Sequence, residues 1–279
     1  MRALPLAPAM TGLPWHLMGL GLVMSLVVST LGFKNVAYFV SLGYAGSIAT
    51  QAAVMPLIYQ DTIGGWVLLQ SALLLMYGLR LGSFILARAR APSFQSEVAA
   101  TAARGAKAGG WITIAIWLSV SLLYVVMFLP ALLSMSAQAG GQALPSVPAG
   151  DAVMAVGLGL EACADWQKSR FKVVNPDRIC TVGLYRMVRF PNYFGEMVFW
   201  LGVWVSAISA FRSPLAWGLG VLGFACIELI MLGASRRLEL KQSSRYGAGS
   251  AYQGYARTTP ILFPFLPLYS MRLRKPAPQ

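Results

Sequence analysis

The stretch that begins at Trp111 and ends at Ser134 reads WITIAIWLSVSLLYVVMFLPALLS, which is 24 residues without a charged side chain. A helix of that length measures about 36 Å, more than the hydrocarbon core of a bilayer, which is about 30 Å thick. The whole chain follows the same pattern, since 57% of its 279 residues are hydrophobic and only 11% are charged. Soluble domains usually carry about 25% charged residues. The sequence therefore predicts an integral membrane protein and excludes an ordinary soluble enzyme, a disordered chain and a disulfide scaffold.

Seven apolar runs are long enough to span the bilayer, and proline or glycine lies near many of the breaks between them, as is typical of helix ends. The runs cover residues 14–33, 36–59, 64–87, 111–134, 147–164, 191–211 and 214–235. We expect an all-α polytopic membrane protein with about seven transmembrane helices, in which residues 1–279 form a single membrane domain. Residues 93–110, rich in alanine, glycine and serine, are expected to form a poorly ordered cytoplasmic loop.

Basic side chains alternate along the chain with the predicted spans. The net charge is +13, from 22 Lys and Arg against 9 Asp and Glu. With the N-terminus outside and the C-terminus in the cytoplasm, 19 of the 22 basic residues fall on the cytoplasmic side. This distribution follows the positive-inside rule. It supports the number of spans and the orientation, indicates a lipid bilayer as the partner, and explains the net charge without nucleic acid.

Residue types that hold metal ions are scarce. His16 is the only histidine, and Cys163, Cys180 and Cys226 do not have the spacing of metal ligands. We therefore expect no metal site, no Ser-His-Asp triad and no haem held by two histidines.

Among the charged residues inside predicted spans, four stand out: Arg80, Glu161, Glu196 and Glu228. Charges within the membrane are costly and usually mark a functional site. The alternative is that they pair with one another or extend to the interface. For Glu228, which is the most isolated of the four, that alternative is favoured.

The start of the sixth predicted span is a candidate anion site. Pro191 suits the first turn of a helix, where its missing N–H costs nothing. The free N–H groups of a helix N-terminus favour an anion. Arg186 and Arg189 lie immediately before it and are suited to hold a phosphate. The alternative is a collar of positive charge followed by an ordinary span.

Polar residues continue into this span at helical spacing. Asn192 and Glu196 are four residues apart and therefore share a helix face, with Tyr193 beside them. Together with the arginines, they predict a pocket for a ligand that carries both phosphates and polar rings.

The end of the fifth predicted span has a similar pattern. Glu161, Asp165 and Lys168 recur at helical spacing. Their carboxylates can accept hydrogen bonds from ribose or amide groups, and Lys168, Arg170 and Lys172 can meet phosphate. The alternative is ordinary ion pairing between successive turns, worth a few tenths of a kcal/mol. In the same span, a Gly-Leu-Gly sequence at residues 157–159 lacks the rest of a dinucleotide fingerprint, and close helix packing is the favoured interpretation.

Four stretches carry a resemblance to a known family. They read DWQKSRFK at residues 165–172, GLYR at 183–186, RFPNYFGE at 189–196, and YQGY at 252–255 with the tail as far as Pro264. This combination resembles the steroid 5-alpha-reductase superfamily, in particular its prokaryotic branch of integral membrane proteins. It is also distantly similar to the isoprenylcysteine methyltransferases. The resemblance covers roughly residues 160–265 and is weak over the N-terminal half.

The resemblance implies a reductase with seven spans. Members bind NADPH at the cytoplasmic side and deliver hydride to a carbon–carbon double bond conjugated to a ketone in a lipid-like or steroid-like molecule. It implies a multi-pass protein of the bacterial inner membrane whose active site faces the cytoplasm. Residues 1–146 would form a four-helix half for the lipid substrate, and residues 147–279 a half that binds the cofactor.

The resemblance also implies roles for individual residues. Tyr77 and Arg80 resemble the family's Tyr-x-x-Arg element, which makes Tyr77 the candidate catalytic acid. Gln51 and Tyr77 would contact the substrate. The residues expected to contact NADPH are Arg80, Glu161, Asp165, Lys168, Lys172, Arg186, Arg189, Asn192, Tyr193, Glu196, Arg236, Arg237 and Tyr255.

Two departures from the family pattern bear on the substrate and the cofactor. Members that reduce steroids carry adjacent Gln and Glu just before a Leu-Pro in the second span, whereas here Ala53, Val54 and Met55 precede Pro56 and only Gln51 is near. The carboxylate that polarises a 3-oxo-steroid is therefore absent at that position. Phe190 stands where many prokaryotic relatives have histidine.

Two other classes of function remain open from the sequence. One is a membrane methyltransferase of the isoprenylcysteine or phospholipid type, which shares the Arg-x-Pro-x-Tyr-x-Gly pattern but uses S-adenosylmethionine. Asp165, Asn192 and Glu196 favour the reductase over it. The other is a transporter or a structural membrane protein that uses the charges within the membrane as a pathway. The absence of an internal repeat disfavours it.

Overall fold

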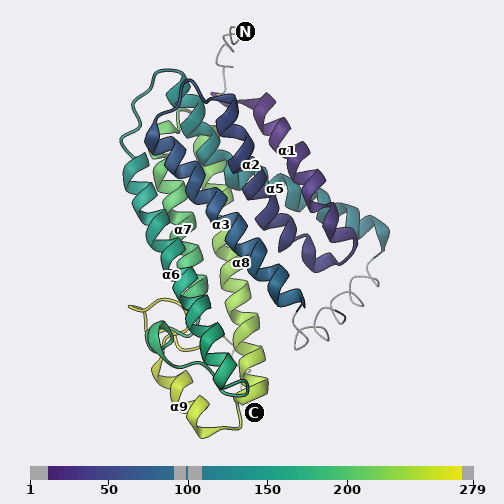
Figure 1. Cartoon of the computed structure of the whole chain (residues 1–279), viewed down its shortest axis with the longest axis vertical. Helices are drawn as coiled ribbons and strands as arrows, with labels where there is room; N and C mark the ends of the chain where they lie inside the picture. The colour runs from purple at the N-terminus through teal and green to yellow at the C-terminus, as the bar shows by residue number, and fades with distance from the viewer. Residues whose placement is uncertain (1–11, 91–98, 100–108, 272–279) are drawn as a thin grey trace, which may run out of the picture. The chain divides into compact units, whose positions relative to one another are not determined.

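A computed structural model describes residues 12–90, 99 and 109–271, and the described residues are helical or irregular, without a strand (Figure 1). The α-helices are α1 (Trp15–Ser29), α2 (Leu42–Ile58), α3 (Gly65–Arg90), α5 (Gly110–Ala139), α6 (Val147–Val174), α7 (Pro191–Ser206), α8 (Pro214–Tyr246) and α9 (Ser250–Thr258). Short 3-10 helices are η1 (Thr30–Phe33), η2 (Val36–Tyr38), η4 (Gly183–Arg186) and η5 (Ile208–Ala210). The predicted cytoplasmic loop 93–110 lies almost wholly outside the described residues.

Within the described residues, six helices are long and apolar enough to cross a membrane. They are Trp15–Phe33, Gly65–Arg90, Gly110–Ala139, Val147–Val174, Pro191–Ala210 and Pro214–Tyr246. The prediction of an all-α polytopic membrane protein is therefore confirmed. The predicted span that is not among these six, residues 36–59, contains α2, whose 17 residues make a helix about 26 Å long, slightly shorter than the hydrocarbon core.

Two helices continue well past the ends that hydropathy predicts. The run expected to end at residue 164 continues as α6 to Val174, and the run expected to end at residue 235 continues as α8 to Tyr246. The added turns are polar and charged, so they leave the apolar pattern, but their Lys, Arg, Gln and Glu residues favour helix. Hydropathy shows where a helix leaves the apolar layer and does not show where the helix ends.

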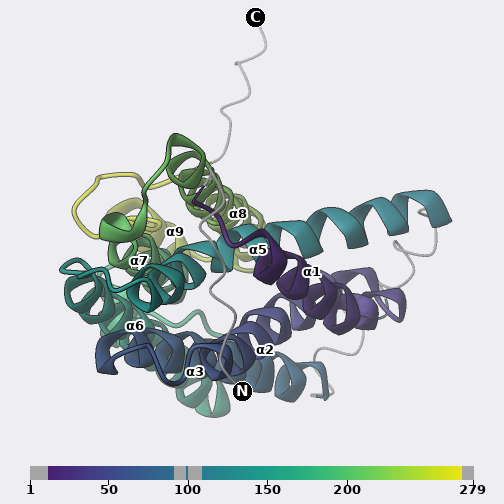
Figure 2. The same cartoon turned by 90° about the horizontal axis from the view of Figure 1, so that it is seen from above.

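The chain divides into two compact units. The first comprises Met1–Asp151 and Val203–Phe224, and the second comprises Ala152–Gly202 and Ala225–Gln279. In the first unit α2 packs against α1 and α3, and α1 also packs against α5 (Figure 2). Gly78 of α3 permits a close approach to α2, because a Cβ there would lie 2.6 Å from the carbonyl oxygen of Ala45.

The second unit has a small hydrophobic core of its own, at the end of the apolar part of α6. Ala164 of α6 packs with Cys180 and Tyr185 from the connection to α7. The backbone N–H groups of Arg189 and Phe190 donate to the carbonyl oxygens of Pro260 and Ile261, at 2.9 and 3.1 Å. The segment after α9 is thereby joined to the residues just before α7, which begins at Pro191 as the sequence predicts.

The orientation of α2 can be tested by labelling from outside. Lys34 and Asp61 are exposed residues before and after α2. If α2 crosses the membrane, a membrane-impermeant maleimide added to intact cells labels Asp61→Cys and does not label Lys34→Cys until the cells are opened. Both variants carry Ser in place of Cys163 and Cys226, and equal labelling of the two positions in intact cells would contradict the seven-span topology.

Candidate active site

Helices α6 and α7 meet backbone to backbone within the second unit. A Cβ on Gly157 would lie 2.3 Å from the backbone nitrogen of Phe199 and 2.7 Å from the carbonyl oxygen of Gly195. A Cβ on Gly195 would lie 2.6 Å from the backbone nitrogen of Glu161. Only glycine fits at these two positions, since any side chain would overlap the backbone of the other helix. We call this contact the α6–α7 seam.

Carboxylates lie buried beside the seam. Glu161 is only 3% exposed, Glu196 follows Gly195 directly and is 5% exposed, and Asp165 is 7% exposed. Glu228 of α8 lies near enough to Glu196 for the two charges to interact. Burial of a carboxyl group is costly unless polar partners surround it, so a cluster of acids on three helices indicates a site built for polar contacts.

The next turn of each helix, toward the connection between them, adds further polar groups. Asp165 lies one turn beyond Glu161 on α6, and Asn192 lies one turn before Glu196 on α7, with Tyr193 next to it. The two helices run in opposite directions, so Asp165 and Asn192 both lie on the side of the seam that faces the connection between α6 and α7. Together with Glu161 and Glu196 they form a strip of polar side chains. Asn192 and Tyr193 are partly exposed, so this end of the strip reaches the surface of the second unit.

Tyr185 is at the centre of the groups that surround this end. Its buried hydroxyl donates to the carbonyl oxygen of Ala164 at 3.4 Å, and its carbonyl oxygen accepts from the hydroxyl of Tyr255 at 2.6 Å. Burial raises the pKa of Tyr185, and the charges of Asp165, Cys180, Tyr255 and Tyr193 act in the same direction. Burial also raises the pKa of Tyr255, while nearby Arg189 lowers it. Both phenols therefore stay protonated at neutral pH and remain hydrogen-bond donors.

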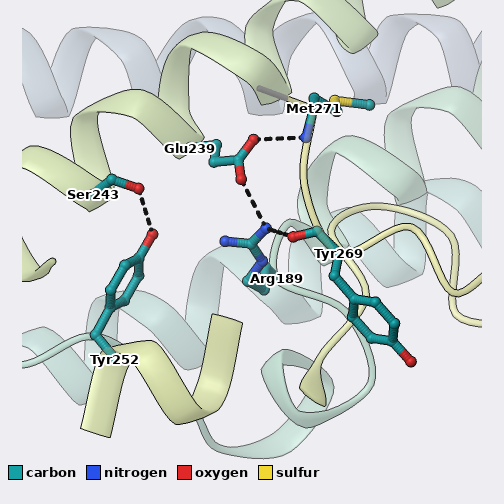
Figure 3. Close-up of polar contacts among 6 residues, drawn as sticks. All are labelled: Arg189, Glu239, Ser243, Tyr252, Tyr269 and Met271. Carbon is teal, nitrogen blue, oxygen red and sulfur yellow. Dashed lines mark hydrogen bonds and ion pairs between the residues drawn. The ribbon is translucent and has the colours of Figure 1, made fainter. Parts of the chain in front are cut away.

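Arg189 is buried inside the second unit, and Figure 3 shows its polar contacts. Its Nη2 donates to Oε1 of Glu239 at 3.3 Å and to the carbonyl oxygen of Tyr269 at 2.6 Å. The other carboxylate oxygen of Glu239 accepts from the backbone N–H of Met271 at 2.9 Å. Nε and Nη1 of Arg189 are buried and have no hydrogen-bond partner among the described residues. Arg189 thus holds the tail in place, and two of its buried donors have no hydrogen-bond partner among the described residues.

The other basic residues of the predicted cofactor site lie in two settings. Arg186, Arg236 and Arg237 are exposed, and Lys168 is half-buried. Lys172 instead donates to the carbonyl oxygen of Pro176 and to the hydroxyl of Tyr246, each at 3.0 Å. Lys172 therefore joins the end of α6 to the end of α8 in this structure.

Tyr77, Arg80 and Gln51 belong to the first unit. Tyr77 is fully buried on α3, and its hydroxyl lies 2.7 Å from that of Tyr44 on α2, so that either can donate. Arg80 follows one turn later and is half-buried. Gln51 is buried at the contact between α1 and α2, where its Nε2 donates to Oγ of Ser25 at 3.3 Å. The structure therefore brings Tyr77 together with Tyr44 and holds Gln51 in a contact between helices.

Sequence reasoning missed Tyr44 and Glu239. Tyr44 is not part of any sequence motif, and its partner Tyr77 lies 33 residues away in the sequence. No local spacing therefore indicates that the two residues are in contact. Glu239 did carry a signal, because it is the single acidic residue between residue 236 and the end of the chain, among eight basic ones. Glu239 also lines a cavity of about 440 Å³, to which Ser243, Tyr252, Gln253, Arg257 and Tyr269 contribute.

The buried ion pair can be compared with an exposed one in the same unit. Glu239→Gln leaves the Arg189 guanidinium buried without its counter-charge, which we expect to cost about 3–5 kcal/mol. Thermal unfolding in detergent should show a large decrease in melting temperature. The control is Asp177→Asn, which breaks the exposed pair of Asp177 and Arg245 (3.1 Å) and should have little effect. Equal, small shifts for both variants would show that the buried pair does not hold the tail.

Comparison with known proteins adds one assignment. No curated protein and no solved structure matches the chain. One family model does match, over residues 32–259, and its description is a protein of unknown function. Because that match includes most of the chain, with α2, α3, the α6–α7 seam and α9, this protein belongs to the DUF1295 family.

Proposed function

We propose that the protein is an NADPH-dependent membrane reductase, which transfers hydride to an activated carbon–carbon double bond of a lipid-like or steroid-like molecule. The observation that carries the proposal is the strip of buried Glu161, Asp165 and Glu196 beside the α6–α7 seam, continued by Asn192. Three of these four residues are the ones by which the sequence resembles the steroid 5-alpha-reductases most specifically: Asp165, Asn192 and Glu196.

The polar groups of the second unit fit the chemistry of NADPH. Carboxylates accept hydrogen bonds from ribose hydroxyls and from a carboxamide, which suits Glu161, Asp165 and Glu196. The phosphates need cations, for which exposed Arg186, Arg236 and Arg237 are available. The buried Nε and Nη1 of Arg189 add two donors without a partner among the described residues. NADH carries two phosphates, and NADPH carries one more. The number of arginines near the proposed site therefore favours NADPH over NADH.

NADPH supplies the hydride, and the residues of this chain supply binding and a proton. Hydride addition to the electron-poor carbon breaks the π bond of the enone and places negative charge on the ketone oxygen as an enolate. The Tyr77 hydroxyl would donate a hydrogen bond to that oxygen and then a proton to the enolate. The contact with Tyr44 supports this role, because a hydrogen bond donated by Tyr44 would stabilise developing charge on Tyr77 Oη.

The substrate we propose is an enone of lipid type and not specifically a 3-oxo-steroid. The Gln-Glu pair of steroid-reducing members is absent before Pro56. The nearby Gln51 donates to Ser25 and to the carbonyl oxygen of Ser47, so contact with a substrate requires its amide to leave these partners. Gln51 and Tyr77 remain the proposed substrate contacts.

Nucleotide binding by the detergent-purified protein tests the proposal. We expect the fluorescence of NADPH to report binding, and Asn192→Ala and Glu196→Gln each to weaken it by about 10–100-fold, since a hydrogen bond to a charged group is worth about 1.5–3 kcal/mol. The control is Asp177→Asn, an exposed residue of the same unit, which should bind like the wild type.

Two results would overturn the proposal. One is NADPH binding that neither substitution changes, which would remove the site. The other is retention of S-adenosylmethionine in place of NADPH, which would make the protein a methyltransferase. A further arm, Tyr77→Phe, should leave NADPH binding unchanged and lower the rate of enone reduction.

A further inference from the structure

The last described residues of the chain present apolar side chains that the fold does not bury. Phe265 is 90% exposed, and Leu266 and Leu268 are exposed as well. They belong to a closed loop, since the N–H of Ile261 donates to the carbonyl oxygen of Leu268 at 2.8 Å. A second bond, from the N–H of Leu266 to the carbonyl oxygen of Phe263 at 3.2 Å, tightens it. We call residues 263–268 the tail loop.

One end of the tail loop lies beside the first turn of a spanning helix. The ring of Phe263 contacts that of Phe194 edge to face, with 6.2 Å between centroids. Phe194 is in the first turn of the span Pro191–Ala210, which has 20 residues and is about as long as the hydrocarbon core is thick. Phe263 is therefore level with the edge of the apolar layer.

The other end of the tail loop lies just outside that layer. The carbonyl oxygen of Tyr269 and the N–H of Met271 bond to Arg189 and Glu239 (Figure 3). Arg189 precedes the span of α7 by two residues, and Glu239 lies on α8 beyond the apolar part of that helix, which ends at residue 235. Exposed Phe265 and Leu266 are thus at the height of the boundary between acyl chains and headgroups.

We propose that the tail loop inserts Phe265 and Leu266 into the lipid at this boundary and anchors the tail to the membrane that the helices cross. Aromatic and leucine side chains favour that layer. The hydrogen bonds of the loop fix its shape beforehand, so insertion costs little conformational entropy. The lipid contact holds the Tyr269 carbonyl oxygen against Arg189.

Spin labels in lipid nanodiscs measure the depth of the tail loop. The probe is a nitroxide on Phe265→Cys, in a background with Ser in place of Cys163 and Cys226, while buried Cys180 is retained. Collision with oxygen, which concentrates in lipid, is compared with collision with a water-soluble nickel complex. Leu229→Cys on α8, 66% exposed along a span, is the lipid-facing control, and Ala251→Cys on α9 is the aqueous control.

The proposal predicts that oxygen accessibility at residue 265 exceeds nickel accessibility and lies nearer to the value at residue 229 than to that at residue 251. A label at residue 265 that collides with nickel as often as the label at residue 251 would overturn the proposal, because the loop would then lie in water. Protection from both reagents would overturn it too, since protein and not lipid would then cover the loop.

Discussion

The backbone contact between α6 and α7 at Gly157 and Gly195 is the constraint on which the second unit depends. It leaves no room for a side chain at either glycine, and it sets Glu161 beside the turn that carries Glu196. In a membrane, helices associate through close packing of small residues, because lipid supplies no hydrophobic drive between them. The same contact therefore both joins two spans and brings two acids together. The proposed cofactor contacts follow from this geometry, since Asp165 and Asn192 lie one turn farther along the same two helices.

Charge determines the structure at the end of the apolar layer. Arg189 is buried, and its partners are a carboxylate from α8 and a carbonyl oxygen from the tail. Without those partners a buried guanidinium would be strongly unfavourable, so the ion pair defines where the tail after α9 lies. Lys172 acts in a comparable way between α6 and α8. The positive-inside rule explains the location of Arg189 and Lys172 by topology alone. Both residues also make hydrogen bonds that join separate segments of the second unit.

Apolar periodicity and charge predicted the class of fold well. Spans, helix starts such as Pro191, and the packing role of Gly157 follow from local patterns. The lengths of α6 and α8 could not be predicted in this way, because hydropathy shows where a helix leaves the apolar layer and does not show where the helix ends. Within the candidate site, helical spacing grouped Glu161 with Asp165 and Asn192 with Glu196. It did not show that Glu239 pairs with Arg189 or that Tyr44 contacts Tyr77, since those partners are 50 and 33 residues apart. Contacts between distant segments depend on how the helices pack, which no local pattern records.

The melting temperatures of two neighbouring glycine variants test the seam most directly. A Cβ on Gly157 would overlap the backbone of α7, whereas a Cβ on Gly159 would have nothing within 4 Å. Overpacking of this kind costs about 1–3 kcal/mol, which corresponds to a decrease of roughly 2–12 °C for a protein of this size. The account predicts that decrease for Gly157→Ala and an unchanged or slightly higher melting temperature for Gly159→Ala. Equal melting temperatures for the two variants would contradict the close approach of α6 and α7.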